Sequence, residues 1–178
     1  EGRLSLDDFM AQLSDDDLIH LLGGQPNVGV SNTFGFGNLP DYGVPSIMTA
    51  DGPAGLRISG ECSMNTTAWP CATLLACTWN PALVQQVGQA GAEEVKENNL
   101  AVWLTPAVNI HRNPLCGRNF EYYSEDPLIA GKMGAAMVKG IQSQHIAASV
   151  KHFAANNKET NRKHSDSRVS ERALREIY

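Results

Sequence analysis

The segment from Cys116 to Pro127 combines one arginine, three carboxylates and three aromatic rings within twelve positions. Arg118 offers a rigid fork of donors and keeps its charge near neutral pH, so it suits paired oxygen acceptors. Glu121 or Glu125 could hold its guanidinium in place. Aromatic faces beside such donors fit a ligand with flat apolar faces and a rim of hydroxyls, as in a sugar. A solvated loop with a satisfied ion pair explains one arginine near a glutamate equally well, so this segment alone leaves both interpretations open.

Two further polar segments, Ala50–Arg57 and Val150–Asn157, carry candidate ligands for the same hydroxyls. Asp51 lies in Asp-Gly-Pro, where an aspartate commonly caps its own backbone in a turn, but a carboxylate there could also accept charge-assisted hydrogen bonds from two neighbouring hydroxyls. Lys151 and His152 are adjacent, and adjacent strand residues face opposite ways, so both reach one ligand only if the backbone bends there. A single histidine near a strand end is a structural residue as often as a ligand.

Two other arginines are weaker candidates. Arg57 either serves the site or pairs with a nearby acid. Arg162, in a polar loop rich in asparagine, either swings back toward the ligand or stays solvated. The remaining histidines receive no role: His20, His111, His145 and His164.

The polar segments follow apolar runs that are typical of buried strands. Residues 46–50 form a short strand candidate that leads directly into Asp51. Residues 100–104 are almost continuously apolar, and residues 146–150 end at Lys151. Each run is therefore expected to present its polar neighbours at its carboxyl end.

Helices are expected between these strands because capping residues mark their starts. Asn80-Pro81 and Asp126-Pro127 each place an N-cap residue before a proline, which predicts helices from 81 to about 97 and from 127 to about 143. Within the first, two glycines are expected to be close-packing positions rather than a nucleotide loop: Gly88 and Gly91. Three further elements are predicted: a helix from Ser14 to Gly23-Gly24, a surface loop over 24–45, and a last helix from Ser170 to the chain end.

The pattern of strand, loop and helix occurs three times, which favours an α/β fold with a parallel sheet and its site at the carboxyl ends of the strands. We therefore expect residues 1–45 to be a helical and loop lead-in, and residues 46–178 to be either the first three or so βα units of a TIM-like (β/α)8 barrel or part of a doubly wound sheet. A full barrel needs about 250 residues, so the barrel is expected to be incomplete in this chain.

Composition excludes several other classes of protein. The net charge of −5 gives no reason to expect a nucleic-acid partner, and no run of eighteen apolar residues predicts a membrane span. The four cysteines have no Cys-x-x-Cys or zinc-finger spacing, so no metal and no disulfide framework are expected; Cys71 and Cys77 are expected to be buried. The common nucleotide-binding fingerprints are absent, and no cofactor is expected. With no signal peptide evident, a cytoplasmic location is the expectation.

Taken together in this order, the segments Ala50–Arg57, Cys116–Pro127, Val150–Asn157 and Glu159–Arg162 resemble the N-terminal barrel domain of family 3 glycoside hydrolases, in particular the β-glucosidases. The similarity runs from about Gly43 to Tyr178. Lys151-His152-Phe153 is not followed by a second histidine, which favours the glucosidase branch over the branch that releases N-acetylglucosamine.

The resemblance implies that five residues grip the glycone in the −1 subsite: Asp51, Arg118, Lys151, His152 and Arg162. Arg57 and Glu121 would support them. It also implies a retaining mechanism on β-glucosides, with an aspartate nucleophile in a Ser-Asp-Trp-like motif and a glutamate acid/base. Neither is expected within these 178 positions, because the nearest match, Ser165-Asp166-Ser167, lies in the wrong unit. The chain alone is expected to be inactive without the remainder of the polypeptide. A β-xylosidase and a non-catalytic sugar-binding barrel remain alternatives, and the oligomeric state is left open.

Overall fold

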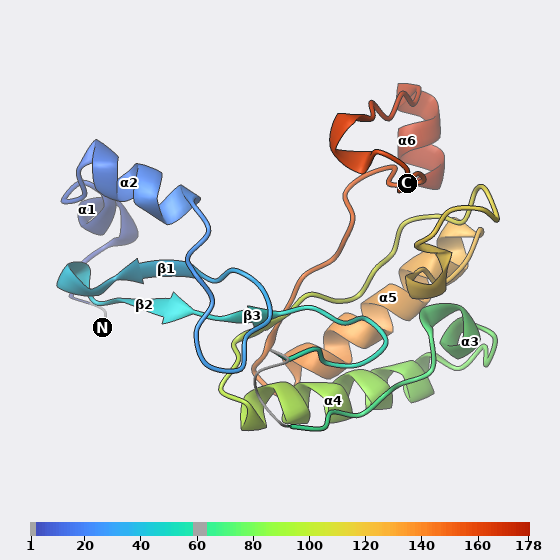
Figure 1. Cartoon of the computed structure of the whole chain (residues 1–178), viewed down its shortest axis with the longest axis horizontal. Helices are drawn as coiled ribbons and strands as arrows, with labels where there is room; N and C mark the ends of the chain where they lie inside the picture. The colour runs from blue at the N-terminus through green and yellow to red at the C-terminus, as the bar shows by residue number, and fades with distance from the viewer. Residues whose placement is uncertain (1–2, 59–63) are drawn as a thin grey trace.

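Three short parallel strands form one sheet, and the first of them, β3, is labelled in Figure 1. The structure, a computed structural model, describes residues 3–58 and 64–178. The strands pair in the order β3-β4-β5, and their bounds are β3 Thr49–Ala50, β4 Val102–Trp103 and β5 Ala147–Ala148. Each predicted apolar run therefore contains a strand of the parallel sheet, and the strands are shorter than the runs.

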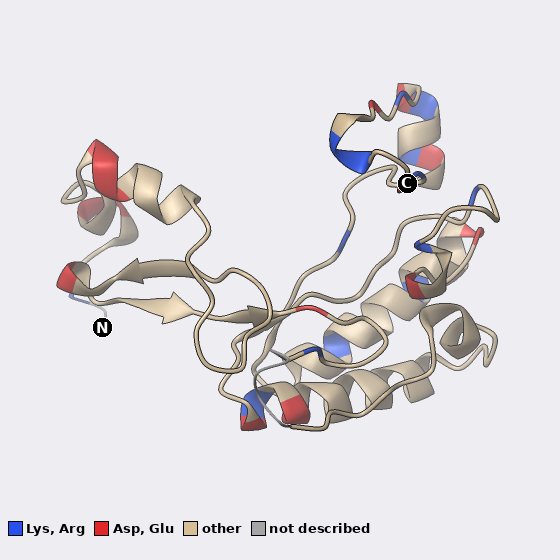
Figure 2. Cartoon of the chain, in the orientation of Figure 1, with Lys and Arg blue, Asp and Glu red and all other residues tan. Residues whose placement is uncertain are grey.

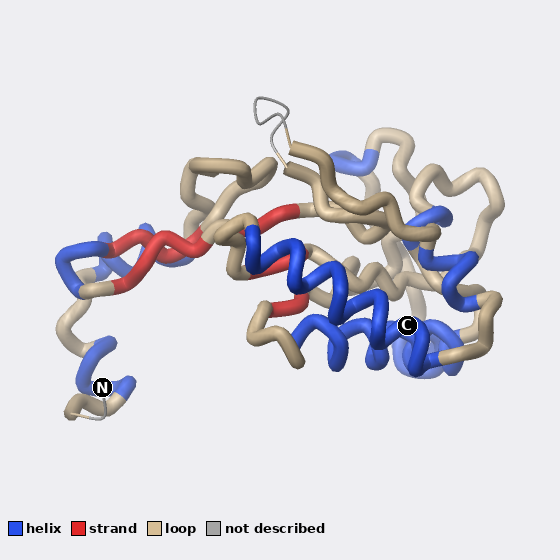
Figure 3. The backbone as a smooth tube through the Cα atoms, turned by 90° about the horizontal axis from the view of Figure 1, so that it is seen from below, coloured by secondary structure: helices blue, strands red, loops and turns tan. Residues whose placement is uncertain are grey.

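Two long helices connect these strands and pack against each other along one side of the sheet (Figure 3). Their bounds are α4 Pro81–Glu97 and α5 Pro127–Gln142. The Asn80 side chain accepts from the backbone N–H of Leu83 at 3.2 Å, and Asp126 Oδ1 accepts from that of Leu128 at 2.7 Å. Both predicted caps are confirmed: each satisfies a backbone donor that the first helical turn leaves free.

Glycines allow α4 to approach its neighbours closely. A Cβ on Gly88 would lie 2.7 Å from the carbonyl oxygen of Met137 in α5, and one on Gly91 would overlap the ring of Trp103. Trp103 is fully buried, and its indole N–H donates to the carbonyl oxygen of Gly52 at 3.0 Å. The predicted close-packing role of both glycines is confirmed, and the packing couples the helix pair to the loop after β3.

The lead-in contains more regular structure than predicted. Its elements are α1 Leu6–Met10, α2 Asp15–Leu22, β1 Phe36–Leu39, the 3₁₀ turn η1 Pro40–Tyr42, and β2 Val44–Ile47. Ser14 and Asp17 form a capping box at α2, as the predicted helix start requires. The predicted loop over 24–45 is wrong where β1 and β2 form an antiparallel hairpin, and the predicted strand 46–50 is split between β2 and β3.

The hairpin and the two lead-in helices project away from α4 and α5, as Figures 1 and 3 show from two directions. Figure 2 marks acidic residues in red on α1 and α2, whereas the last helix, α6 Glu171–Ile177, carries both acidic and basic residues. Ser170 caps α6 by accepting from the backbone N–H of Ala173, so this predicted helix start is also confirmed.

One short helix and one cysteine differ from expectation. Helix α3, Ala72–Ala76, was not predicted, and it packs against the 3₁₀ turn η2, Asn119–Glu121. Cys77, the C-cap of α3, is exposed rather than buried, and Cys71 is only partly buried. Cys62 lies outside the described residues.

Candidate functional site

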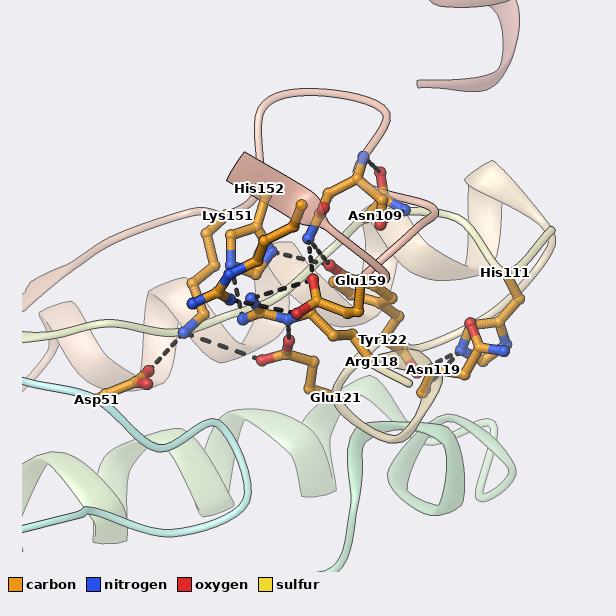
Figure 4. Close-up of polar contacts among 12 residues, drawn as sticks. Asp51, Asn109, His111, Arg118, Asn119, Glu121, Tyr122, Lys151, His152 and Glu159 are labelled. Carbon is orange, nitrogen blue, oxygen red and sulfur yellow. Dashed lines mark hydrogen bonds and ion pairs between the residues drawn. The ribbon is translucent and has the colours of Figure 1, made fainter. Parts of the chain in front are cut away.

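The polar segments meet at the carboxyl ends of the three parallel strands (Figure 4). Asp51 follows β3 directly, and Arg118 lies in the long loop between β4 and α5. Lys151 exchanges backbone hydrogen bonds with the β4 loop: its N–H donates to Pro106 O at 3.0 Å and its carbonyl accepts from Val108 N–H at 2.6 Å. These bonds prolong the β4–β5 pairing as far as Lys151 and aim that residue at the loop after β3.

Asp51 accepts from two cations through its two different oxygens. Lys151 Nζ lies 2.5 Å from Oδ1, and Arg57 Nη2 lies 2.8 Å from Oδ2. Burial raises the pKa of the Asp51 carboxyl, but the hydrogen bond and charge of Lys151, assisted by the Gly52 backbone and Arg57, outweigh that effect and lower the pKa below its ordinary value. Asp51 is therefore a carboxylate at neutral pH. Arg57 takes the predicted role of pairing with a nearby acid, and that acid belongs to the site.

Arg118 is held by the buried carboxylate of Glu121. Its Nε donates to Glu121 Oε1, and the other carboxylate oxygen lies 3.9 Å from Lys151 Nζ. Burial lowers the pKa of Arg118, but Glu121 more than compensates, so the guanidinium stays charged. Of the two predicted acidic partners, Glu121 fulfils the role, and Glu125 is exposed.

His152 bonds through both ring nitrogens. Arg118 Nη2 lies 2.8 Å from Nε2, and the Tyr122 hydroxyl lies 2.9 Å from Nδ1. The Tyr122 and His152 rings meet edge to face, with centroids 5.9 Å apart. The peptide bond between Lys151 and His152 is cis, and both side chains enter one cluster although they are adjacent in sequence.

Glu159 extends the cluster outward to Arg162. Its Oε1 lies 3.6 Å from Arg118 Nη1, and its Oε2 lies 3.3 Å from Arg162 Nη1. The Arg162 side chain is 54% exposed. Among the described residues, Arg162, which belongs to the 3₁₀ turn η3 (Arg162–His164), joins the cluster only through Glu159.

The ion pairs form one continuous series of alternating sign, which we call the charge series: Arg57, Asp51, Lys151, Glu121, Arg118, Glu159 and Arg162. It contains every predicted site residue except His152, which bonds to it through Arg118. Four cations and three carboxylates nearly neutralise each other, so the series offers many hydrogen-bond donors and acceptors with little net charge. Such a surface suits an uncharged ligand rich in hydroxyl groups.

Several residues of the cluster were not singled out from the sequence. Asn156 donates to the Tyr122 hydroxyl at 3.0 Å, and its backbone N–H donates to Asn109 Oδ1 at 3.0 Å. His111, which was assigned no role, bonds through Nε2 to the carbonyl oxygens of Asn119 and Tyr122 at 2.8 and 3.0 Å. These residues hold the loops that carry Arg118 and His152. The available signals were the position of Tyr122 inside the Arg118 segment and the spacing of three between Glu159 and Arg162.

Among residues 3–58 and 64–178, no group of three or more histidine, cysteine, aspartate or glutamate side chains is arranged to hold a metal ion. Within the same residues, no helix is long and apolar enough to cross a membrane.

Parallel βα units with a polar cluster at the carboxyl ends of the strands are the arrangement of a (β/α) barrel enzyme. Residues 38–178 match the model of the glycosyl hydrolase family 3 N terminal domain, and the chain belongs to that family.

Named relatives agree with this assignment. β-Glucosidase A of Butyrivibrio fibrisolvens is 67% identical over the whole chain, which spans 21% of that protein. An exo-α-(1→6)-L-arabinopyranosidase of Bifidobacterium longum is 51% identical over 76% of this chain and 19% of its own length. The structure of β-glucosidase 3B from Thermotoga neapolitana in complex with α-D-glucose superposes with a TM-score of 0.89 at 47% identity, covering 97% of this chain and 26% of that one.

The chain thus spans about a fifth of the length of the curated relatives it matches. The predicted fold class, the first βα units of an incomplete barrel, is confirmed by these matches together with the open three-stranded sheet of the described residues.

Proposed function

We propose that this chain supplies the glycone-binding part of a retaining β-glucosidase that hydrolyses terminal non-reducing β-D-glucosyl residues. The single observation that carries the proposal is the convergence of Asp51, Arg118, Lys151 and His152 in one hydrogen-bonded cluster. Relatives named β-glucosidase support the choice of substrate. In this proposal Asp51 accepts from sugar hydroxyls while Lys151 and Arg118 donate to them.

The reacting pair is proposed to lie elsewhere in the polypeptide. A general acid must be protonated at working pH, and the lowered pKa of Asp51 makes it unsuitable. Glu121 and Glu159 both pair with Arg118. Their carboxylate oxygens therefore hold its guanidinium and are not free to attack a sugar. Retaining hydrolysis needs a nucleophile and an acid about 5–5.5 Å apart, so both are assigned to segments beyond these residues.

Arg162 is proposed to contact the glycone less directly than the other four. Its exposure and its pairing with Glu159 place it at the outer end of the charge series. The cytoplasmic location expected from the sequence stays a prediction.

The test is an assay of the full-length protein on 4-nitrophenyl β-D-glucoside, with the β-xyloside, the N-acetyl-β-glucosaminide and the α-L-arabinopyranoside alongside. The last is included because one relative is named as an arabinopyranosidase. The glucoside should be hydrolysed with the highest kcat/KM, and NMR should detect β-glucose as the first product anomer. Preference for another glycoside would overturn the substrate, first release of α-glucose would overturn retention, and glucose binding without any hydrolysis would favour a non-catalytic sugar-binding protein.

A further inference from the structure

Tyr122 is a buried tyrosine whose hydroxyl sits between His152 and Asn156. Its side chain is fully buried, its oxygen lies 2.9 Å from His152 Nδ1, and Asn156 Nδ2 donates to it at 3.0 Å. The same Asn156 amide nitrogen lies 3.4 Å from Glu159 Oε1, which can only accept, so this nitrogen is a donor in both directions. The Tyr122 hydroxyl oxygen therefore accepts a hydrogen bond from Asn156.

The donors and acceptors around His152 determine which of its nitrogens carries the proton. Arg118 has donors only, so its Nη2, 2.8 Å from His152 Nε2, requires a lone pair on Nε2. A neutral imidazole with a lone pair on Nε2 carries its hydrogen on Nδ1. That Nδ1–H then points at Tyr122 Oη and donates to it.

We propose that Tyr122 is a positioning residue for the glycone site: its hydroxyl oxygen accepts the Nδ1–H of His152 and thereby holds the Nε2 lone pair toward Arg118. The inference rests on the proposed function, since it concerns how the same site is kept ready. The opposite tautomer would place an N–H against the Arg118 guanidinium, and two donors would then face each other. A ligand hydroxyl that replaces Arg118 at Nε2 must therefore donate its own proton to the ring.

Hydrogen bonds to the backbone of Tyr122 hold this residue in place, so its hydroxyl oxygen has a defined position. The carbonyl oxygen of Tyr122 accepts from Thr73 Oγ1 at 2.9 Å and bonds to His111 Nε2 at 3.0 Å. Burial also raises the pKa of Tyr122 to about 12, so the hydroxyl stays neutral through the working pH range. A fixed acceptor at Nδ1 keeps the imidazole in one tautomer and one orientation.

The neighbouring tyrosine offers a matched control. Tyr123 is 3% exposed and follows Tyr122 directly, and none of the hydrogen bonds among the described residues involves its hydroxyl. Tyr122→Phe and Tyr123→Phe each remove one oxygen atom from a buried ring at adjacent positions. In the full-length protein, Tyr122→Phe should lower kcat/KM for the aryl glucoside about tenfold or more, and Tyr123→Phe less than about threefold.

A double-mutant cycle with His152→Ala separates positioning from general structural support. If Tyr122 acts through His152, adding Tyr122→Phe to His152→Ala should cost little, because the group that it orients is gone. Full additivity of the two losses, with unchanged thermal midpoints, would overturn the inference, as would equal effects of Tyr122→Phe and Tyr123→Phe.

The same cycle is run on the dissociation constant for D-glucose, measured by calorimetry, which needs no turnover. A wild-type protein that binds glucose without hydrolysing any glycoside would overturn the proposed function but leave the cycle able to confirm or overturn the role of Tyr122. A wild-type protein that neither binds glucose nor hydrolyses a glycoside would overturn both.

Discussion

Lys151 Nζ lies 2.5 Å from Asp51 Oδ1, although 100 positions of the chain separate the two residues. The contact joins the loop after β3 to the segment after β5, and β4 lies between those strands in the sheet. The Asp51–Lys151 contact therefore spans the sheet from its first strand to its third at the carboxyl ends of the strands. Lys151 also lies 3.9 Å from Glu121, so one ammonium group connects the parts of the site that follow all three strands.

Asp51→Asn tests the carboxylate at nearly constant shape. Without its charge, residue 51 is a weaker acceptor for sugar hydroxyls and no longer forms an ion pair with Lys151. We expect kcat/KM for the aryl glucoside to fall about 100-fold or more in the full-length protein, equivalent to about 2.7 kcal/mol of transition-state stabilisation. Asp166→Asn removes a similar charge from an exposed pair with Arg168 and should leave kcat/KM unchanged. Retained activity with a large fall in thermal midpoint would instead make Asp51 a structural turn residue.

Arg118→Lys keeps the positive charge and removes the planar guanidinium with its several N–H donors. Arg118 uses three nitrogens on three different partners, Glu121, His152 and Glu159, and a single ammonium cannot reach all of them. We expect a loss of about tenfold to 100-fold in kcat/KM, with most of it in KM for the glycone. The control is Arg172→Lys on α6, whose exposed partner is Glu176, and it should be kinetically silent. Equal kinetics of the two variants would contradict the role of Arg118.

Protonation of His152 should cost stability on the acid side. Burial and the positive charge of Arg118 lower the pKa of His152 from its ordinary value of 6.5, with Lys151 acting in the same direction and Glu121 and Asp51 opposing. Because the pKa of His152 is lower in the folded chain than in the unfolded chain, the unfolded chain binds more protons between that lowered pKa and pH 6.5. The contribution of neutral His152 to the stability of the folded protein is therefore fully present above pH 6.5 and is lost as the pH falls through the lowered pKa of His152.

Thermal midpoints of the wild type and of His152→Gln, measured from pH 7.5 down to about 5, would test this expectation. The difference between them should shrink as the pH falls. His164→Gln, at an exposed histidine, should follow the wild type in parallel. A difference that does not depend on pH would show that His152 titrates alike in the folded and unfolded chains.

Two glycines of α5 should respond oppositely to alanine. A Cβ on Gly140 would overlap the carbonyl oxygen of Gln85 in α4, whereas one on exposed Gly131 has nothing within 4 Å. Gly140→Ala must push the helices apart and should destabilise the protein by about 1–3 kcal/mol. Gly131→Ala gains helix propensity and should stabilise it by up to about 1 kcal/mol. Denaturant unfolding of both variants measures the contrast, and equal signs would contradict the close packing of α4 and α5.

Elements with local signals could be predicted from the sequence. The Asn-Pro and Asp-Pro caps marked the starts of α4 and α5 because the capping bond is made within three residues. The β1–β2 hairpin could not be predicted in the same way. β1 is four residues long and contains Gly37 and Asn38, residue types typical of turns, which here adopt positive φ angles of 80° and 61°. Helix α3 has no side-chain cap and spans five residues, which leaves no periodic pattern to detect.

The site residues also fall into two groups: some could be predicted from the sequence, and others could not. Asp51 and Lys151 could be placed together because both follow strands of one parallel sheet. Tyr122 could not be paired with His152 or with Asn156, because side chains 30 and more positions apart meet through loop geometry that no local pattern records. Arg162 joins the cluster through Glu159, and the resemblance to the family did not indicate that intermediary.

The charge series has a consequence for how the site responds to ionic strength. Each cation of the site already has a carboxylate of the protein as its counterion, so an entering neutral sugar displaces no small ions from solution. Affinities that depend on counterion release fall steeply with salt, and partly buried pairs are screened much less than exposed ones. Sugar affinity should therefore stay nearly constant from low to moderate salt, whereas any anionic competitor that reached Lys151 or Arg118 would first have to displace Asp51 or Glu121.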